Sequence, residues 1–338
     1  MVVVFGPNLA VDRVLGVPGL RVGGVFRTGH TRVVVGGKGA NVARALRALG
    51  EPVHLVGLVA GWTGRFIRES LAEEGIPATL VEAQGLSRTC TLLVDPEAGQ
   101  ATVVNEEGDL RLPAAKLGRL EQMTASLAAE ARALVCSGSL PPSVPADLYA
   151  RIIRRARAAG VVTILDTSGP PLEQGVRAGP DLIKPNRAEL GRLLASRGLP
   201  EPGPAGGQPE PAADAGPGGG EAELARAALR LLQEGVGTVV VSLGAAGALA
   251  VTPEEAWLVQ APRVPVVNPI GAGDSMVAAL AAGLSRGRRL PDLLRLAVAA
   301  GSADVATFGP GVISPDQVQR LLPQTTALRL PLPGGAAG

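Results

Sequence analysis

The chain has 338 residues and a mean hydropathy of +0.26, which is enough for one large α/β domain or two small ones. Its 32 basic residues nearly balance its 30 acidic residues, and no basic stripe interleaves with aromatic residues, which make up 2% of the chain. This composition argues against nucleic acid as a partner, and no apolar run reaches the length of a membrane span.

Short apolar strands alternate with helical segments along most of the chain. The strands that we expect are Val2–Phe5, Pro52–Leu58, Ala133–Ser137, Val161–Asp166, Leu182–Lys184 and Thr238–Leu243. The helices that we expect are Lys38–Leu49, Thr63–Glu74, Pro145–Ala159, Asn186–Arg197, Glu221–Glu234, Gly271–Ser285 and Pro291–Thr307. Unbroken apolar strands that alternate with helices predict a mostly parallel central sheet covered by helices on both faces.

Two segments do not follow this alternation, residues 12–35 and residues 87–106. The second contains two short apolar stretches, Thr91–Val94 and Ala101–Val104, on either side of a turn with the sequence DPEAGQ. This arrangement is typical of a β-hairpin. We therefore expect both segments to form a small β-sheet lid attached to the main sheet.

The other irregular parts of the chain are rich in Pro and Gly. Residues 198–220 have too few apolar side chains to form a core, and we expect a disordered surface insertion there. We expect a flexible C-terminal tail at residues 324–338, within a single domain that covers residues 1–338. The two cysteines, Cys90 and Cys136, have no metal-ligand spacing and the N-terminus does not resemble a signal peptide, so we expect a cytoplasmic protein.

Polar residues stand where five apolar runs end, namely Ser137, Asp166, Lys184, Ser242 and Asn268. Ligands of open parallel sheets bind beyond the carboxyl ends of the strands, so we expect these side chains to meet at one cleft. Ordinary turn chemistry explains any single one of them. The chain has only three lysines, however, Lys38, Lys116 and Lys184, and few asparagines. Because two of the five ends use these scarce residues, a functional cleft is favoured.

The segment NPIGAGD is a glycine-rich turn that leads into an expected helix. The backbone N–H groups of Gly271, Ala272 and Gly273, with the positive end of the helix dipole, would attract an anion. Asp274 places a carboxylate beside that site. If the anion is a phosphoryl group in transit, Asp274 can act as the general base that takes the proton from an attacking hydroxyl. A helix-capping role for Asp274 is an equally good interpretation on spacing alone.

A second glycine motif, GGKGAN, precedes the helix expected from Lys38. It lacks the spacer and the Ser or Thr of a P-loop, and it lacks the final glycine of the dinucleotide fingerprint. Lys38 and Asn41 would lie in the first helical turn and face whatever approaches the N-terminus of the helix. A polyol or a sugar phosphate suits these two side chains.

Both motifs resemble the signature sequences of the PfkB (ribokinase-like) carbohydrate kinases, and their order and separation make the match specific. The phosphosugar branch of that family, typified by 1-phosphofructokinase and tagatose-6-phosphate kinase, has motifs similar to NLAVDR, SRTCTLLVD, SGSLPPSVPADLY, LDTSG, LIKPNRAEL and VVVSLGAAGAL. Ribokinases have Asp-Thr before GAGD, whereas this chain has NPI, which also favours that branch. The resemblance covers Val2 to about Leu322 and implies a ribokinase-like three-layer α/β/α fold with a small β-sheet lid.

The resemblance also implies a role for each matching residue. Asp274 would be the catalytic base, and Gly271, Ala272 and Gly273 would form the anion hole. The residues that would bind the phosphosugar are Asp12, Gly37, Lys38, Asn41, Arg88 and Ser139, with Arg88 and Lys38 on its phosphate. The residues that would bind the nucleotide are Lys184, Asn186, Ser242, Gly244 and Gly247. Asn186 and Glu189, which match an N-x-x-E motif, would position Mg²⁺ through water.

The implied activity is the ATP-dependent phosphorylation of a ketohexose phosphate, with fructose 1-phosphate as the first candidate. Tagatose 6-phosphate and fructose 6-phosphate are alternatives, because one arginine does not show which carbon carries the resting phosphate. A non-catalytic sugar-phosphate-binding protein would need neither Asp274 nor Glu189. A nicotinamide-dependent oxidoreductase would need GxGxxG after the first strand, where this chain has FGPNLAVD. The expected ligands are ATP, Mg²⁺ and a phosphosugar, and the resemblance also allows a homodimer through the lid.

Overall fold

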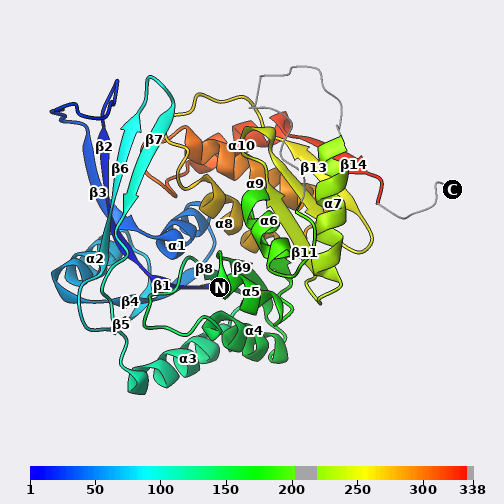
Figure 1. Ribbon diagram of the computed structural model, residues 1–338, viewed down its shortest axis with the longest axis horizontal. Coiled ribbons are helices and arrows are strands. Elements are labelled where there is room, and N and C mark those ends of the chain that lie inside the picture. Colours follow the sequence, from blue (N-terminus) through cyan, green and yellow to red (C-terminus); the bar gives the residue numbers. More distant parts are fainter. Residues whose placement is uncertain (202–218, 333–338) are drawn as a thin grey trace.

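The structure is a computed structural model that describes residues 1–201 and 219–332. Most of the insertion expected at residues 198–220 therefore lies outside the described residues, as do residues 333–338 of the expected tail. A ten-stranded sheet with its helices makes up most of the molecule, and a four-stranded sheet lies beside it (Figure 1).

The strands of the main sheet are β1 (Val2–Asn8), β4 (Val53–Val59), β5 (Ala78–Glu82), β8 (Ala133–Ser137), β9 (Val162–Asp166), β10 (Leu182–Ile183), β11 (Thr238–Ser242), β12 (Ala248–Val251), β13 (Ala256–Gln260) and β14 (Thr326–Leu330). Their spatial order is β14-β13-β12-β11-β10-β9-β8-β1-β4-β5. Every pair from β11 to β5 in this order is parallel, whereas β12, β13 and β14 add an antiparallel edge. The mostly parallel sheet expected from the sequence is therefore confirmed.

Strand β1 shows why the strands are apolar at almost every position. Val2 and Val4 pack into one hydrophobic core, while Val3 and Phe5 pack into a second core. All four side chains are fully buried. Successive side chains of a strand point to opposite faces, so a sheet that is covered on both faces needs apolar residues at every position.

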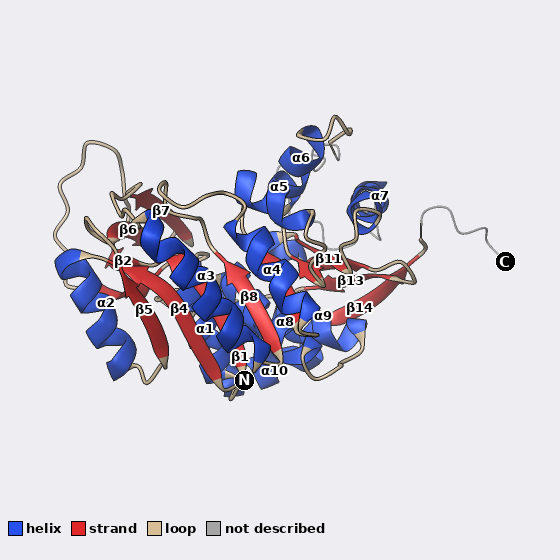
Figure 2. Ribbon diagram, turned by 90° about the horizontal axis from the view of Figure 1, so that it is seen from below, coloured by secondary structure: helices blue, strands red, loops and turns tan. Residues whose placement is uncertain are grey.

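The helices form one layer on each face of the main sheet. The layer on the Val2 face comprises α1 (Lys38–Ala48), α2 (Gly61–Glu73), α8 (Ala272–Leu284), α9 (Leu290–Val305) and α10 (Pro315–Leu321). The layer on the Val3 face comprises α3 (Ala114–Ala129), α4 (Leu148–Ala158), α5 (Pro170–Val176), α6 (Arg187–Ala195) and α7 (Gly219–Leu232). Two short 3-10 helices are η1 (Gly244–Ala246) and η2 (Leu322–Gln324). Figure 2 shows the strands between the two helical layers.

The smaller sheet comprises β2 (Ala10–Gly16), β3 (Thr31–Gly36), β6 (Arg88–Asp95) and β7 (Gln100–Asn105), in the order β3-β2-β6-β7. These strands come from the two segments that interrupt the strand–helix alternation, and β6 and β7 form the expected hairpin. The sheet packs on Ile270, just before α8, and on Phe308, just after α9. It therefore rests on the loops that flank the N-terminus of α8.

The C-terminal segment differs from the flexible tail expected from residue 324. Residues Thr326–Leu330 form β14, which pairs with β13 at the edge of the main sheet. Ala327, Leu328 and Leu330 pack against the two hydrophobic cores. Burial of these three apolar side chains holds the strand in place, so this part of the tail prediction is wrong.

Several elements were not among those expected, namely α3, α5, α10, β5, β12 and β13. None of them changes the predicted layer architecture, because each adds to a helical layer or to an edge of the main sheet. Within residues 1–201 and 219–332, no helix has both the length and the apolar character required to cross a bilayer.

Candidate active site

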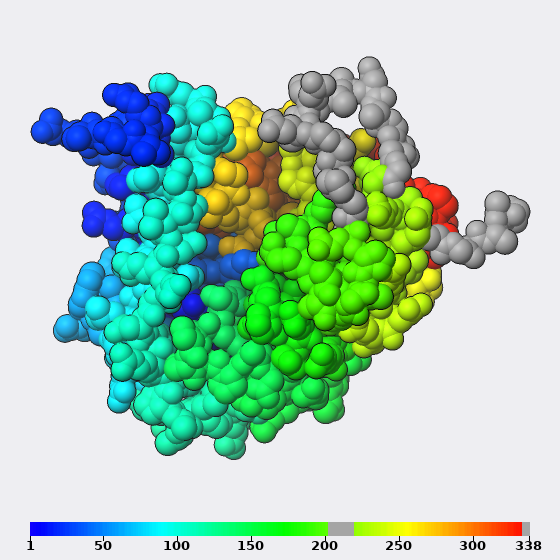
Figure 3. All heavy atoms as spheres, in the orientation of Figure 1, coloured from blue at the N-terminus to red at the C-terminus, as the bar shows by residue number. Residues whose placement is uncertain are grey.

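A cavity of about 1010 Å³ opens between the smaller sheet and the carboxyl ends of the main-sheet strands. Figure 3 shows this hollow between the cyan hairpin of β6 and β7 and the green and yellow part of the chain. Every site residue that the family resemblance implies lines the cavity, namely Asp12, Gly37, Lys38, Asn41, Arg88, Ser139, Lys184, Asn186, Glu189, Ser242, Gly244, Gly247, Gly271, Ala272, Gly273 and Asp274. Of the five strand ends expected to meet at one cleft, Lys184 and Ser242 line it, whereas Ser137, Asp166 and Asn268 are buried and do not. The fold thus brings the separate motifs together at one place, while the roles of the individual residues stay predictions.

The N-terminus of α8 forms the floor of this cavity. Gly271 is its N-cap and has a φ of 102°, a left-handed conformation that glycine adopts without strain. A Cβ atom at this position would lie 2.7 Å from the Asp304 carboxylate and from the backbone of Gly311. Within the described part of the chain, the N–H groups of Gly271, Ala272 and Gly273 have no recorded acceptor. They are therefore free to bind an anion.

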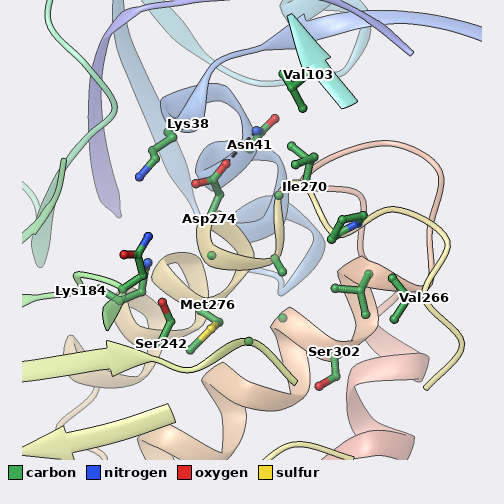
Figure 4. Close-up of a pocket in the computed structure, with 18 of the residues that line it drawn as sticks. Lys38, Asn41, Val103, Lys184, Ser242, Val266, Ile270, Asp274, Met276 and Ser302 are labelled. Carbon is green, nitrogen blue, oxygen red and sulfur yellow. Dashed lines mark hydrogen bonds between the residues drawn. The ribbon is translucent and has the colours of Figure 1, made fainter. Parts of the chain in front are cut away.

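Asp274 lies in the first turn of α8, and its carboxylate does not cap the helix. Its Oδ2 atom accepts a hydrogen bond of 2.8 Å from Nδ2 of Asn41 on α1. Figure 4 shows this bond and places Lys38 and Lys184 on one side of Asp274. Burial raises the pKa of Asp274 to about 6, although Lys38, Asn41 and Lys184 oppose the rise. The capping interpretation is wrong, and the carboxylate remains mostly ionised near neutral pH.

Two lysines meet at a single buried carboxylate behind the cavity. Nζ of Lys38 lies 3.1 Å from Oδ2 of Asp166, and Nζ of Lys184 lies 3.3 Å from Oδ1. Burial alone would raise the pKa of Asp166, but the two lysines hold it below its ordinary value. A Cβ atom on Gly273 would lie 3.3 Å from Nζ of Lys184. The glycine therefore allows this ammonium group to lie beside the free N–H groups of α8.

The smaller sheet contributes a second charged group to the cavity. Asp12 on β2 is almost fully buried, and its carboxylate occupies the space where a Cβ atom of Gly36 would be. Burial raises the pKa of Asp12 to about 6, while Arg88 and Arg44 oppose this rise. Arg88, at the start of β6, also lines the cavity. A carboxyl group and a guanidinium group thus line the cavity from the same sheet.

The N-x-x-E residues begin helix α6 on the opposite wall. Oδ1 of Asn186 accepts the N–H of Glu189 at 2.8 Å, and Oε2 of Glu189 accepts the N–H of Asn186 at 2.9 Å. This reciprocal pattern is a capping box, so the two side chains stabilise the start of α6. Asn186 also forms an isolated β-bridge with Ser242, which places the end of β11 against the same wall.

Three polar residues, Asp166, Asn8 and Asp304, help to form the site although the sequence gives them no role there. The sequence places Asp166 at a strand end near the cleft, and the neutralisation of two scarce lysines requires such an acid nearby. Asn8, another scarce asparagine, donates from Nδ2 to Oγ of Ser139 at 2.9 Å and lines the cavity. Asp304 is buried under the turn at Gly271. An acidic residue within the apolar segment LAVAAGSADV is the one feature of the sequence that indicates a buried carboxyl group there.

Asp304 ties α8 to the loop after α9. Its Oδ2 atom accepts from Oγ of Ser275 at 3.1 Å and from the N–H of Gly311 at 3.3 Å. Burial raises its pKa to about 8, and the nearby charge of Asp274 adds to this rise. The carboxyl group therefore holds the turn around Gly271 from below.

Comparison with known proteins identifies this arrangement. Residues 1–317 match the model of a family described as pfkB family carbohydrate kinase. The chain belongs to the pfkB family of carbohydrate kinases. The resemblance predicted from GGKGAN and NPIGAGD is therefore confirmed.

Relatives of this pfkB-family kinase support the phosphosugar branch. The chain is 34% identical to 1-phosphofructokinase of Rhodobacter capsulatus, with 96% of each chain covered. It is 31% identical to tagatose-6-phosphate kinase of Staphylococcus epidermidis, with 90% of this chain and 92% of that protein covered. Phosphofructokinase-2 from Escherichia coli, solved with substrates and products, has a TM-score of 0.82 and 29% identity over 96% of this chain and 98% of that chain. The solved ribokinase of Arabidopsis thaliana has a TM-score of 0.70 over 95% of this chain and 98% of that chain, which confirms the ribokinase-like fold.

The lysine–aspartate–lysine arrangement gives a testable expectation for this kinase. Asp166→Asn removes the charge shared by Lys38 and Lys184 but keeps the shape of the side chain. We expect the free energy of unfolding to fall by about 3 kcal/mol, near the lower end for a broken buried ion pair, because Lys38 is partly exposed. Denaturation in urea measures this change.

Asp147→Asn is the matched control, because Asp147, the N-cap residue of α4, pairs with Arg151 at a half-exposed site near the surface. Loss of that surface pair should change the free energy of unfolding by less than about 1 kcal/mol. Equal effects of the two substitutions would show that Asp166 is not needed to hold the two lysines.

Proposed function

We propose that the protein transfers the γ-phosphoryl group of ATP to a hydroxyl of a ketohexose phosphate, with fructose 1-phosphate as the first candidate. One observation carries the proposal. Asp274, the free N–H groups of α8 and the cation of Arg88 line the same cavity. The relatives named 1-phosphofructokinase and tagatose-6-phosphate kinase support a phosphosugar as the acceptor. Tagatose 6-phosphate and fructose 6-phosphate remain alternatives of the same class.

Asp274 would act as the general base of this reaction. The acceptor hydroxyl attacks the γ-phosphorus of ATP, the bond to the bridging oxygen breaks, and ADP leaves. The proton of the hydroxyl moves to the Asp274 carboxylate. With a pKa of about 6, this carboxylate is ionised at neutral pH and is a stronger base than an ordinary aspartate. A protein that only binds sugar phosphates would not need such a base.

The anion hole would stabilise the phosphoryl group in transit. The N–H groups of Gly271, Ala272 and Gly273 would donate to its oxygens, and Lys184 lies close enough to add a positive charge. Burial alone would lower the pKa of Lys38, but the neighbouring carboxylates raise it above its ordinary value, so this ammonium group stays charged. Fixed donors of this kind need little reorganisation during the reaction.

The phosphosugar would bind at the end of the cavity below the smaller sheet. Arg88 and Lys38 would bind its resting phosphate, because both are cations on this side of the cavity. Asp12, Asn41, Gly37 and Ser139 would bind its hydroxyl groups. The smaller sheet would act as a lid that excludes water, so that ATP is not hydrolysed in place of transfer.

The nucleotide would bind at the other end, along the carboxyl end of β11. Ser242, Gly244 and Gly247 line the cavity there, and Asn186, which also lines it, forms a β-bridge with Ser242. Positive φ values at Gly244 and Gly247 fit a turn that approaches a ligand through its backbone.

Mg²⁺ would be held through water by Glu189 and Asn186. Among the described residues, no group of three or more His, Cys, Asp or Glu side chains could enclose a metal ion. Mg²⁺ keeps several waters and usually binds substrate phosphates, so it needs no such cage. The capping box uses one carboxylate oxygen of Glu189, and the second oxygen can bind the water shell. When bound, the ion neutralises charge on the nucleotide phosphates.

A panel of acceptors tests the proposed function. The purified protein is assayed with ATP and Mg²⁺ against fructose 1-phosphate, fructose 6-phosphate, tagatose 6-phosphate, fructose and ribose, and ADP release is followed. Clear preference for one phosphosugar supports the proposal. Arg88→Ala should then weaken binding of that phosphosugar by roughly tenfold or more, because a charged hydrogen bond is lost, and leave the KM for ATP nearly unchanged. Equal losses for both substrates would make Arg88 a structural residue.

Substitution of Asp274 tests the mechanism. Asp274→Asn should lower kcat by roughly 10²–10⁴-fold, the usual contribution of a general base, while ATP still binds in calorimetry. In the unaltered protein kcat should fall as the pH drops through about 6, because the base is then protonated. A variant with unchanged turnover would remove Asp274 from the mechanism.

A homodimer through the lid is our proposal for the assembly. Val33 on β3 and Val104 on β7 are exposed on the two edge strands of the smaller sheet, with exposed fractions of 45% and 58%. The solved tetrameric inhibited form of phosphofructokinase-2 from Escherichia coli is an assembly of that relative. Val33→Lys with Val104→Lys should convert a dimer to a monomer in analytical ultracentrifugation. A dimer that survives both changes would place the interface elsewhere.

A further inference from the structure

Arg44 forms an unusually complete set of hydrogen bonds behind the active site. It lies on α1 one turn after Asn41, and only 11% of its side chain is exposed. Its five N–H donors have five acceptors: Oε2 and Oε1 of Glu74 at 2.6 and 2.9 Å, the carbonyl of Val35 at 2.8 Å, and Oδ1 of Asn41 and the carbonyl of Pro310 at 3.2 Å each. These acceptors come from β3, from α1, from the end of α2 and from the loop after α9.

The bond to Asn41 determines which way the Asn41 amide faces. Because Arg44 has only donors, the amide presents its oxygen to Arg44, and its Nδ2 group then faces Asp274. The reversed amide would bring two donors together at Arg44 and two acceptors together at Asp274. One of the two N–H groups of the Asn41 amide is thus directed at Asp274, and the other is left for a bound sugar.

The loop that contains Pro310 couples the same arginine to the turn of α8. Gly311 packs directly against Asn41, because a Cβ atom on Gly311 would lie 2.7 Å from the Asn41 Cα atom. The N–H of Gly311 donates to Asp304, beneath Gly271. Arg44 therefore contacts both the amide that binds the base and the loop that supports the anion hole.

We propose that Arg44 is a positioning residue that fixes the Asn41 amide so that it donates to Asp274 and sets the proton affinity of the base. The inference rests on the proposed function of Asp274. Loss of the fixed amide would weaken a hydrogen bond that favours the ionised carboxylate, and the base would then be protonated at higher pH.

Other titratable groups also face Asp274, and the test has to leave them unchanged. They are Lys38 on α1, Asp166 at the end of β9, Lys184 after β10, and Asp304 on α9. Arg44→Lys keeps the positive charge but loses the planar fork that binds five acceptors. Arg47→Lys, in the exposed last turn of the same helix, is the matched control.

A double-mutant cycle measures whether Arg44 acts through Asn41. Arg44→Lys should lower kcat at neutral pH by about tenfold and move the acidic limb of the kcat profile upward by about one pH unit. In an Asn41→Ala background the same substitution should change kcat by less than about twofold, because the amide is already absent. Arg47→Lys should leave both the rate and the profile unchanged.

An NMR titration tests the inference independently of activity. The chain has only five asparagines, Asn8, Asn41, Asn105, Asn186 and Asn268, so selective ¹⁵N-asparagine labelling gives few side-chain amide signals. The Asn41 pair is assigned as the one lost in Asn41→Ala. Its shift should follow the ionisation of Asp274, stop doing so in Asp274→Asn, and titrate at higher pH in Arg44→Lys. These results are expected even if the acceptor panel shows that the proposed substrate is wrong.

Two results would overturn the inference. One is a loss of kcat in Arg44→Lys that is equally large with and without Asn41. The other is an Asn41 signal that titrates at the same pH in Arg44→Lys as in the unaltered protein. If Arg44→Lys does not fold, Glu74→Gln replaces it, because this change removes only the charge that anchors the guanidinium. It should move the Asn41 titration upward by a smaller amount, and an unmoved titration there would also reject the inference.

Discussion

A helix end that attracts phosphate has to accommodate a carboxylate in its own first turn. The N-terminus of α8 provides free N–H groups, and Asp274 lies within the same turn. A phosphate bound at these N–H groups would be repelled by the carboxylate if no positive charge lay nearby. Lys38 and Lys184 supply that charge, and Asp166 holds both ammonium groups in place from behind. The charges therefore alternate in sign. The negative Asp166 lies behind the two positive lysines, and the lysines face the carboxylate of Asp274 and any phosphate in the cavity.

Burial makes this balance effective, because charges interact more strongly where water is excluded. Asp166 is fully buried and stays ionised because two cations contact it. Asp274 is also buried, but its contacts are weaker, so its pKa rises to about 6. Two carboxylates of the same site thus differ in proton affinity because their partners differ. The one with the stronger contacts is structural, and the other is available to accept a proton.

Small residues allow these charged groups to come together. A Cβ atom on Gly39 would lie 2.6 Å from the Cα atom of Gly6, so α1 approaches β1 through backbone alone. This close approach brings Lys38 and Asn41 to the carboxyl ends of the strands. Gly273 makes similar room for Lys184 beside α8. Glycines at these positions are therefore what allows two of the three lysines to lie at the cavity.

Much of the fold and most of the site could be predicted from the sequence. Lys38, Asn41 and Asp274 stand in local motifs, so the motifs alone located them. Asp304 could not be located in this way, because its contacts depend on how the loop after α9 folds against α8. Strand β14 could not be predicted from its own residues, because its alternation of apolar and polar residues is short. Its pairing with β13, which lies far away in the sequence, makes this segment a strand. The N-x-x-E spacing matches a metal motif, but the same spacing also satisfies a capping box.

The hydrogen bond between Asn41 and Asp274 joins two motifs that are 233 residues apart in the chain. Each motif is a glycine turn followed by a helix, and neither contains the complete chemistry. The first supplies an amide and an ammonium group, while the second supplies a carboxylate and three free N–H groups. Their contact is held by α1 packing against α8, with Gly311 wedged against Asn41. Arg44 follows Asn41 by one turn, so the first motif also contains the residue that orients its own amide. A family signature can therefore include residues that do not touch the substrate, because the side chains that do touch it need neighbours that fix their orientation.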